Sequence, residues 1–332
     1  MKAFIIDRYK SFDGGRFADM PEPKVGDREV LVQVHAAGVN VLDSKIRSGE
    51  FKLFLPYHLP LILGNDVAGI VVLVGPDVKQ FKVGDEVYAR PDKDRIGTFA
   101  EYISMDEVDV ALKPKGISME EAASIPLVGL TAWQALVEKG NLKKGQKVFI
   151  QAGSGGVGSL AIQLAKHLGA TVATTTSAAN IDWVKSLGAD IVIDYRKEEF
   201  ENVLSDYDLV LDSQGKALEK ALRILKPGGK IIGIGGPPDP AFADDLGKGW
   251  LIRLIMGLLS SGIRRKAKAK NVSYSFLFMR ASGAQLREIT VLIDSGVIRP
   301  VVDRVFPFAE TNEALAHIEK GRAKGKVVIK VK

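Results

Sequence analysis

The stretch that decides the fold is Val148–Gly158, which reads VFIQAGSGGVG. An apolar run typical of a buried strand leads into the pattern G-x-G-x-x-G, carried by Gly153, Gly155 and Gly158. The pattern alone is weak evidence, but the residues after it have the apolar spacing of a helix that ends at Gly169. This order predicts a dinucleotide-binding turn, in which backbone N–H groups and the helix dipole face a pyrophosphate.

Strand and helix patterns alternate through the residues that follow. Strand-like runs recur at Ala170–Thr176, Ile191–Ile193, Asp208–Asp212 and Lys230–Gly235, with helix-like stretches between them. Counting the strand before the turn, this alternation predicts a parallel, doubly wound sheet of at least five strands.

The N-terminal residues have a different pattern. Short β-like runs such as Val30–His35 and Ile70–Val74 are separated by the turn signals Gly75-Pro76-Asp77 and Gly84-Asp85. We interpret this part as an irregular antiparallel barrel. The chain has 332 residues, which exceeds the usual size of a single domain, so we expect two domains.

Composition narrows the function classes. Cys is absent, which excludes disulfides and thiolate metal ligands. The net charge is +6, but most Lys and Arg are spread among Asp and Glu, so we interpret the charge as a solvated surface and do not expect nucleic-acid binding. No apolar run approaches the roughly 18 residues that span a bilayer, and Lys2–Ile6 has a strand pattern rather than a leader pattern. We therefore expect a cytoplasmic location.

The end of the second strand bears on the choice of dinucleotide. NAD enzymes usually place an Asp or Glu about 20 residues past the glycine motif, where it binds the ribose 2′-OH. Here the strand ends in Thr174-Thr175-Thr176-Ser177, and the first acid is Asp182 in the next helix. The missing acid favours NADPH, although the nearest cations, Lys185 and Arg196, do not directly follow the strand. Ser177 is a candidate donor to a 2′-phosphate or, alternatively, a helix N-cap.

Four further segments fit one known family. In chain order they read GNDVAGIV (64–71), GDEVY (84–88), GTFAEY (97–102) and AASIPLVGLTA (122–132). Together with the glycine motif they resemble the medium-chain dehydrogenase/reductase superfamily nearly end to end, and above all its quinone oxidoreductase branch, which includes zeta-crystallin. The resemblance implies an α/β protein with a GroES-like β-barrel substrate domain and a Rossmann doubly wound parallel-sheet domain, assembled as a homodimer.

The expected boundaries follow from the same resemblance. Residues 1–125, completed by 280–332, would form the GroES-like domain. Residues 126–279 would form the Rossmann NADPH-binding domain, with a helical insert near 240–270.

The resemblance also bears on metal. The zinc alcohol dehydrogenases of the superfamily carry a His-Glu pair where this chain has Asn65-Asp66, and they use cysteines at both of their zinc sites. We therefore expect no zinc. Simple alcohol oxidation then lacks its usual Lewis acid, whereas hydride addition to a quinone or an electron-poor alkene needs mainly orientation and a proton donor. The expected activity is NADPH-dependent reduction of a small-molecule quinone or enone.

Site residues are carried over by matching position. The resemblance implies Ser154, Gly156, Val157, Ser177 and Tyr195 at the adenosine-phosphate half of NADPH, with Asn40 and Thr131 nearer the nicotinamide. The motif adds Gly155, the segment before the tail adds Phe278 beside the nicotinamide, and the terminal motif adds Lys326 as a further cofactor contact. The structural alternatives are a strand end for Tyr195, a turn for Asn40, an ordinary helix position for Thr131 and a solvated basic loop for Lys326.

The proton donor is less defined. Related enoyl-thioester reductases have a Tyr eleven residues after the Asn that aligns with Asn40, and here that residue is Phe51, which weakens a fatty-acid reductase role. Asp43 and Tyr57 are the remaining candidates, together with Asn40, for positioning substrate or relaying a proton. The four His residues are scattered without ligand spacing, so we interpret them as structural.

One segment stands apart. The apolar run 250–259 is followed by the basic run 264–270. It fits a substrate lid or a dimer edge, which we favour, or a membrane-surface patch. Two alternatives to the leading function therefore stay open: a non-catalytic zeta-crystallin-like protein that binds NADPH or RNA, and a membrane-peripheral reductase of lipid quinones.

Overall fold

The computed structural model describes residues 1–10, 14–52 and 55–332. The chain divides into two compact units. Unit 1 comprises Met1–Leu130 and Arg280–Lys332, and unit 2 comprises Thr131–Met279.

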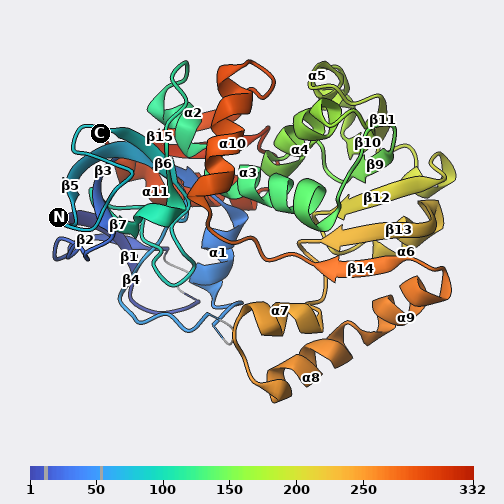
Figure 1. The fold of residues 1–332 in the computed structure, drawn as a ribbon, viewed down its shortest axis with the longest axis horizontal. Helices are drawn as coiled ribbons and strands as arrows, with labels where there is room; N and C mark the ends of the chain where they lie inside the picture. The colour runs from blue at the N-terminus through green and yellow to red at the C-terminus, as the bar shows by residue number, and fades with distance from the viewer. Residues whose placement is uncertain (11–13, 53–54) are drawn as a thin grey trace. The chain divides into compact units, whose positions relative to one another are not determined.

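Unit 2 is built on a six-stranded sheet in which all neighbouring strands are parallel (Figure 1). The order is β11-β10-β9-β12-β13-β14, so the chain starts at the middle of the sheet and winds outward in both directions, as in a doubly wound fold. This confirms the predicted fold class and adds β14 to the predicted strands. The strands are β9 (Lys147–Ile150), β10 (Thr171–Thr176), β11 (Ile191–Asp194), β12 (Tyr207–Asp212), β13 (Leu225–Gly233) and β14 (Ser273–Phe276).

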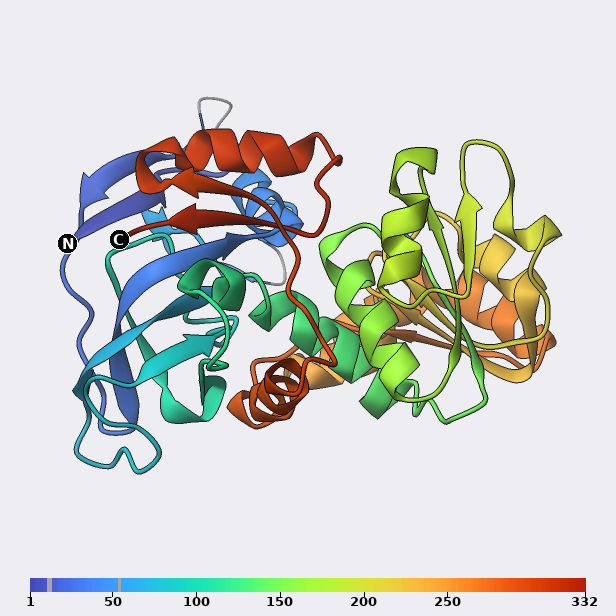
Figure 2. The same ribbon diagram turned by 90° about the horizontal axis from the view of Figure 1, so that it is seen from above.

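Helices cover both faces of this sheet (Figure 2). The helix after the glycine motif packs through buried Leu160, Ala161 and Leu164, and Gly169 follows it with φ 79°, a left-handed conformation that suits glycine at a helix end. The helices are α4 (Gly156–His167), α5 (Ile181–Ser186), α6 (Leu218–Ile224), α7 (Pro240–Asp245), α8 (Trp250–Leu259) and α9 (Ser261–Ala269). Before them, α3 (Pro126–Trp133) crosses the boundary between the units.

Unit 1 contains two sheets of mainly antiparallel strands. The smaller has the order β2-β1-β4, and the larger has the order β15-β16-β3-β5-β6-β8 with β7 also paired to β3. The β15–β16 pair is parallel, and α11 (Thr311–Glu319) connects the two strands as a crossover. The strands are β1 (Lys2–Ile6), β2 (Arg16–Asp19), β3 (Glu29–Val39), β4 (Leu61–Ile62), β5 (Val67–Val74), β6 (Glu86–Ala89), β7 (Tyr102–Asp106), β8 (Val110–Leu112), β15 (Val302–Pro307) and β16 (Lys326–Lys330).

Strand pairing in unit 1 brings three chain segments to one place. β16 pairs with the end of β3, where Val327 lies opposite Val39, and β5 pairs with β3 where Ala68 lies opposite Ala36. The first residue of β16, the residues before β5 and the start of α1 (Val41–Ser48) therefore meet beside the end of β3. The other helices of unit 1 are α2 (Met119–Ala123) and α10 (Gly283–Asp294).

Candidate functional site

Three glycines shape the turn between β9 and α4. An added Cβ would lie 2.3 Å from Thr174 Oγ1 at Gly153 and 2.4 Å from Ala152 O at Gly158, so neither position accepts a side chain. Gly155 differs, because the only atom within 4 Å of its added Cβ is Ala152 O, at 3.4 Å. Packing within the protein does not require glycine there, and the missing side chain leaves room for a ligand to approach the backbone.

The same turn presents backbone donors. α4 begins after Gly155, and no side chain caps its first turn. The first N–H groups of a helix have no intrahelical acceptor and lie at the positive end of the helix dipole. Ser154, Gly155, Gly156 and Val157 are all partly exposed at this turn. The predicted phosphate-binding residues are therefore together, and the turn fits the pyrophosphate of a dinucleotide.

Ser177 and Tyr195 lie next to each other across two strands. β10 ends at Thr176 and β11 at Asp194, which are partners in the parallel register. The Tyr195 N–H donates to Thr176 O at 3.2 Å. The residues that follow the two strands thus share one edge of the sheet, the carboxyl edge at which ligands bind in doubly wound folds.

The side chains at this edge are suited to an anion. Ser177 Oγ accepts a hydrogen bond from Asn180 Nδ2 at 3.3 Å, and its own hydrogen can be donated to an anion. The Tyr195 ring is 56% exposed, and the Arg196 guanidinium carbon lies 5.7 Å from its centroid. Arg196 therefore supplies the cation that the end of β10 itself lacks.

The two remaining candidates of unit 2 lie in other segments. Thr131 is buried in α3. Phe278 follows β14, and its ring centroid lies 5.3 Å from that of Phe242 in α7. The Asp239 carboxylate connects α7 to β14, because it accepts hydrogen bonds from the N–H groups of Phe242 and Phe276. The cofactor roles of Thr131 and Phe278 stay predictions.

Unit 1 holds a buried polar cluster, which comprises Asn40, Asp43, Asn65, Asp66 and Lys326. All of its members are less than 5% exposed. Asn40 is the N-cap of α1, and its N–H donates to Asp43 Oδ2 at 2.7 Å. On the other side of Asp43, Oδ1 accepts from Asn65 Nδ2 at 2.7 Å. The predicted pair Asn40 and Asp43 is thus brought together, with Asn65 as an additional member.

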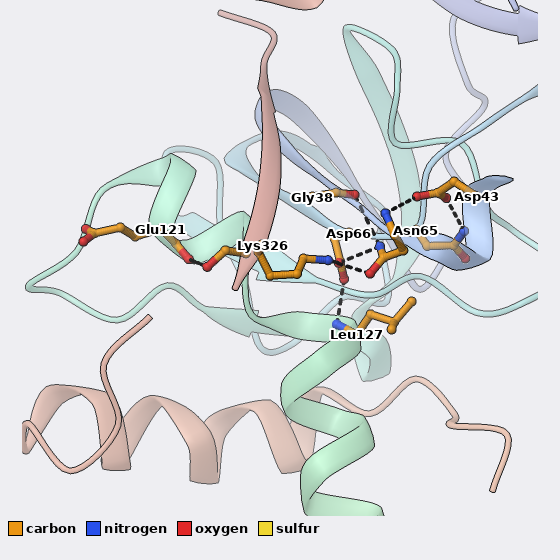
Figure 3. A network of polar contacts seen from close by, with 9 residues as sticks. Gly38, Asp43, Asn65, Asp66, Glu121, Leu127 and Lys326 are labelled. Carbon is orange, nitrogen blue, oxygen red and sulfur yellow. Dashed lines mark hydrogen bonds and ion pairs between the residues drawn. The ribbon is translucent and has the colours of Figure 1, made fainter. Parts of the chain in front are cut away.

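An ion pair forms the other half of the polar cluster (Figure 3). Lys326 Nζ lies 3.0 Å from Asp66 Oδ2 and donates to Asn40 Oδ1 at 2.5 Å. Asn40 Nδ2 also donates to Asp66 Oδ2, at 2.9 Å, and the Leu127 N–H donates to Asp66 Oδ1 at 2.6 Å. Asn40 therefore links the two carboxylates, and the predicted cofactor contact Lys326 is engaged with side chains of unit 1.

The protonation of Asp43 is unusual. Burial raises the pKa of Asp43 to about 7, against the opposing effects of the hydrogen bonds from Asn65 and Asn40 and of the Lys326 charge. Asn65 Oδ1 is buried and has no hydrogen-bond partner among the described residues. If the Asn65 amide turns over, this oxygen can accept a hydrogen bond from a protonated Asp43 carboxyl.

Tyr57 lies outside the polar cluster. It is half-buried, its hydroxyl donates to Lys93 O at 2.7 Å, and burial raises the pKa of Tyr57. Within the described residues, no hydrogen bond joins Tyr57 to Asn40 or Asp43. Its catalytic role, like theirs, stays a prediction.

Sequence reasoning missed two buried groups, Asp66 and Arg90. Arg90 follows β6, is 1% exposed and donates from Nη1 to Pro91 O, while its Nε has no partner in the described part of the chain. Burial lowers the pKa of Arg90, which Tyr57 and the nearby acids oppose. A buried cation without a bound carboxylate is costly, and the nearby acids offset part of that cost. The Asn65-Asp66 dipeptide was visible in the sequence as the counterpart of a metal-binding pair, whereas Arg90 gave no signal.

No group of three or more His, Asp or Glu side chains suited to a metal ion occurs among residues 1–10, 14–52 and 55–332. In the same residues, no helix is long and apolar enough to cross a membrane.

Two family models match the chain. The model described as alcohol dehydrogenase GroES-like domain matches residues 26–115, and the model described as zinc-binding dehydrogenase matches residues 187–329. The first match agrees with the GroES-like fold expected for the N-terminal part.

Curated relatives match over nearly the whole chain. The mitochondrial NAD(P)H oxidoreductase RTN4IP1 of Danio rerio is 38% identical, covering 100% of this chain and 91% of the relative. The 2-methylene-furan-3-one reductase of Solanum lycopersicum is 37% identical, covering 99% and 79%. The chloroplastic NADPH-dependent alkenal/one oxidoreductase of Arabidopsis thaliana is 36% identical, also covering 99% and 79%.

Solved structures of similar proteins match the fold over the whole chain. A quinone oxidoreductase from Coxiella burnetii has a TM-score of 0.87 and 32% identity, covering 100% of this chain and 99% of the other. A mycobacterial protein solved as a complex with NADPH has a TM-score of 0.83 and 27% identity, covering 100% of both chains.

Proposed function

Because this chain belongs to the medium-chain dehydrogenase/reductase superfamily, in which it resembles quinone oxidoreductases, we propose that it reduces quinones or α,β-unsaturated carbonyl compounds with NADPH and without zinc. It is an NAD(P)H-dependent oxidoreductase. The choice of NADPH, the substrate class and the independence of zinc are the parts that we propose.

The observation that carries the NADPH proposal is the edge formed by Ser177, Tyr195 and Arg196. β10 ends without an acid, Ser177 offers a hydroxyl donor, and Arg196 stands beside the exposed Tyr195 ring. A phosphate on the ribose 2′ oxygen would meet a donor and a cation there, whereas the acid that usually binds the free 2′-OH of NAD is missing.

The turn after β9 would bind the rest of the dinucleotide. The open side of Gly155 and the first-turn N–H groups of α4 fit a pyrophosphate. Bound NADPH would supply the hydride that reduces the substrate. The protein's own contribution is to hold the two reacting molecules in position and to stabilise charge on the substrate oxygen.

Unit 1 offers groups for that task. Asn40 lies between the two carboxylates of the polar cluster, and Asp43 holds a proton with a pKa of about 7. Zinc independence is supported by the donor set: Asn65 is a weak metal ligand, and Asp66 already accepts from Lys326, Asn40 and the Leu127 N–H. The substrate class is supported by the activities in the names of the tomato, Arabidopsis and Coxiella proteins.

The test begins with fluorescence titration of the purified protein with NADPH and NADH. NADPH oxidation is then measured with a panel of benzoquinones, naphthoquinones and short enones, before and after dialysis against a chelator. We expect tighter binding of NADPH and turnover of at least one panel member that dialysis does not change.

Each part of the proposal has its own contrary result. Preference for NADH would contradict the role of Ser177 and Arg196. Loss of turnover on chelation, restored by zinc alone, would contradict the metal-free chemistry. Tight NADPH binding without turnover on any panel member would favour the non-catalytic alternative.

A further inference from the structure

Helix α8 exposes a large apolar face. Its outward residues are Trp250, Leu251, Leu254, Ile255, Leu258 and Leu259, which are between 41% and 77% exposed. The opposite face is attached to the unit, because Met256 is fully buried and Gly257 faces Pro240 of α7. Single exposed apolar residues are ordinary, but six on one helix form a patch that a soluble surface rarely leaves uncovered.

Helix α9 continues from α8 and carries the charges. Figure 1 shows the two helices following one another beside α7 and β14. Ile263 and Ala267 of α9 are buried, whereas Arg264, Arg265 and Lys268 are exposed. These three cations have no carboxylate partner in the described part of the chain. The apolar patch of α8 is therefore next to unneutralised positive charge.

The surrounding sequence reinforces this charge. From Leu246 to Met279, the last residue of unit 2, there is no Asp or Glu, and there are seven Lys or Arg. Of these, Arg253 pairs with Asp244, and Lys266 pairs with Glu219. Residues 139–181 also lack Asp and Glu, but their five Lys are spread over 43 residues, whereas five Lys or Arg fall within residues 264–270.

We propose that the apolar face of α8 and the cations of α9 dock this protein on an anionic lipid surface. A short helix with exposed Trp and Leu on one side is suited to lie in the headgroup region, where Trp prefers the interface. Lys and Arg beside it are attracted by anionic headgroups. The apolar run is too short to span a bilayer, so the contact is peripheral.

Charge also argues against the competing occupant, a second copy of this chain. A twofold contact through the same face would bring each acid-free segment toward its own copy. The whole chain carries a net charge of +6, so such a pair would oppose like charges. An anionic lipid surface satisfies both the apolar and the charged part of the patch.

The experiment is flotation of the full-length protein with vesicles of phosphatidylcholine alone or with about 30% phosphatidylglycerol. The charge variant is Arg264→Gln, Arg265→Gln and Lys268→Gln. Its control is Lys143→Gln, Lys144→Gln and Lys147→Gln, which removes the same charge from exposed positions before and at the start of β9. We expect wild type and control to float with the anionic vesicles only, and the charge variant to partition on the order of 100-fold more weakly.

The apolar half is tested separately. Leu254→Ser with Leu258→Ser changes two exposed residues and is expected to abolish flotation while the protein stays folded. Trp250, which is 77% exposed, should give a blue shift of its fluorescence on anionic vesicles that Trp250→Leu removes while flotation persists. Equal flotation with neutral vesicles, or equal loss in the charge variant and its control, would overturn the proposal. So would a wild type that never floats but forms a dimer that the Leu254 and Leu258 changes dissociate.

Discussion

The buried carboxyl of Asp43 makes the pH dependence of stability a direct test of the polar cluster. Burial raises the pKa of Asp43 from 3.8 to about 7. The folded protein therefore keeps a proton that the unfolded chain loses, so the unfolding free energy falls as the pH rises through this window and levels off above it. Between about pH 5 and about pH 8 the loss is about 2.5 kcal/mol. The variant Asp43→Asn cannot ionise, and this part of the decline should disappear.

The assay is urea unfolding of wild type and Asp43→Asn at the two pH values, with Asp19→Asn at an exposed strand position as the control. The amide offers one acceptor fewer than the carboxylate, which costs about 1–3 kcal/mol at either pH. If the Asn65 amide turns over, the new amide N–H can donate to Asn65 Oδ1, which reduces that cost. The informative quantity is therefore the difference between the two pH values. An unfolding free energy of Asp43→Asn that declines as steeply as that of wild type would refute the buried, protonated carboxyl.

Three further predictions concern the dinucleotide site and the ion pair. Gly158→Ala should lower the unfolding free energy by about 1–3 kcal/mol, because its Cβ would lie 2.4 Å from a backbone oxygen. Gly155→Ala should change the unfolding free energy by less than about 0.5 kcal/mol, because its Cβ has room. The same change should weaken NADPH binding about tenfold or more. Fluorescence titration and urea unfolding separate the two glycines; similar stability losses would show that both serve packing alone. Ser177→Asp should weaken NADPH binding more than NADH binding in the same titration, and equal effects would place the 2′ oxygen elsewhere. Lys326→Met should lower the unfolding free energy by about 3–5 kcal/mol, because the buried Asp66 carboxylate is left uncompensated. Adding Asp66→Asn to the same chain should recover part of that loss. A loss below about 1 kcal/mol for Lys326→Met in urea unfolding would contradict the ion pair.

Local pattern was enough to predict the doubly wound sheet, because its signals are contiguous. The apolar strand Lys147–Ile150 and the helix Gly156–His167 lie on either side of a motif whose glycines at 153 and 158 have no room for a side chain. β14 was missed because Ser273–Phe276 alternates polar and apolar residues, unlike the apolar runs of the inner strands. Its place is set by pairing with β13, which a local pattern does not encode.

The dinucleotide-binding residues could be predicted from the sequence more easily than the polar cluster, for a related reason. Ser154, Gly155, Gly156 and Val157 are consecutive, so one motif names them all. In the sequence, Lys326 is one of several cations in a basic segment. Only the pairing of β16 with β3 places its ammonium against Asp66, 260 residues earlier in the chain. A buried ion pair between remote segments has no local sequence pattern from which it could be predicted.

Charge balance within the polar cluster explains why these remote residues act together. With Asp66 ionised and Lys326 protonated, the two charges offset one another, and a second carboxylate at Asp43 would leave a net negative charge in a volume from which water is excluded. Burial is the main cause of the raised pKa of Asp43, and the neighbouring Asp66 carboxylate adds to it, so a proton retained on Asp43 also keeps the cluster neutral. Removing the Lys326 charge should therefore raise the pKa of Asp43 further, because that charge opposes the effect of burial. Asn40 donates to one carboxylate through its N–H and to the other through Nδ2, so this residue carries the coupling between them.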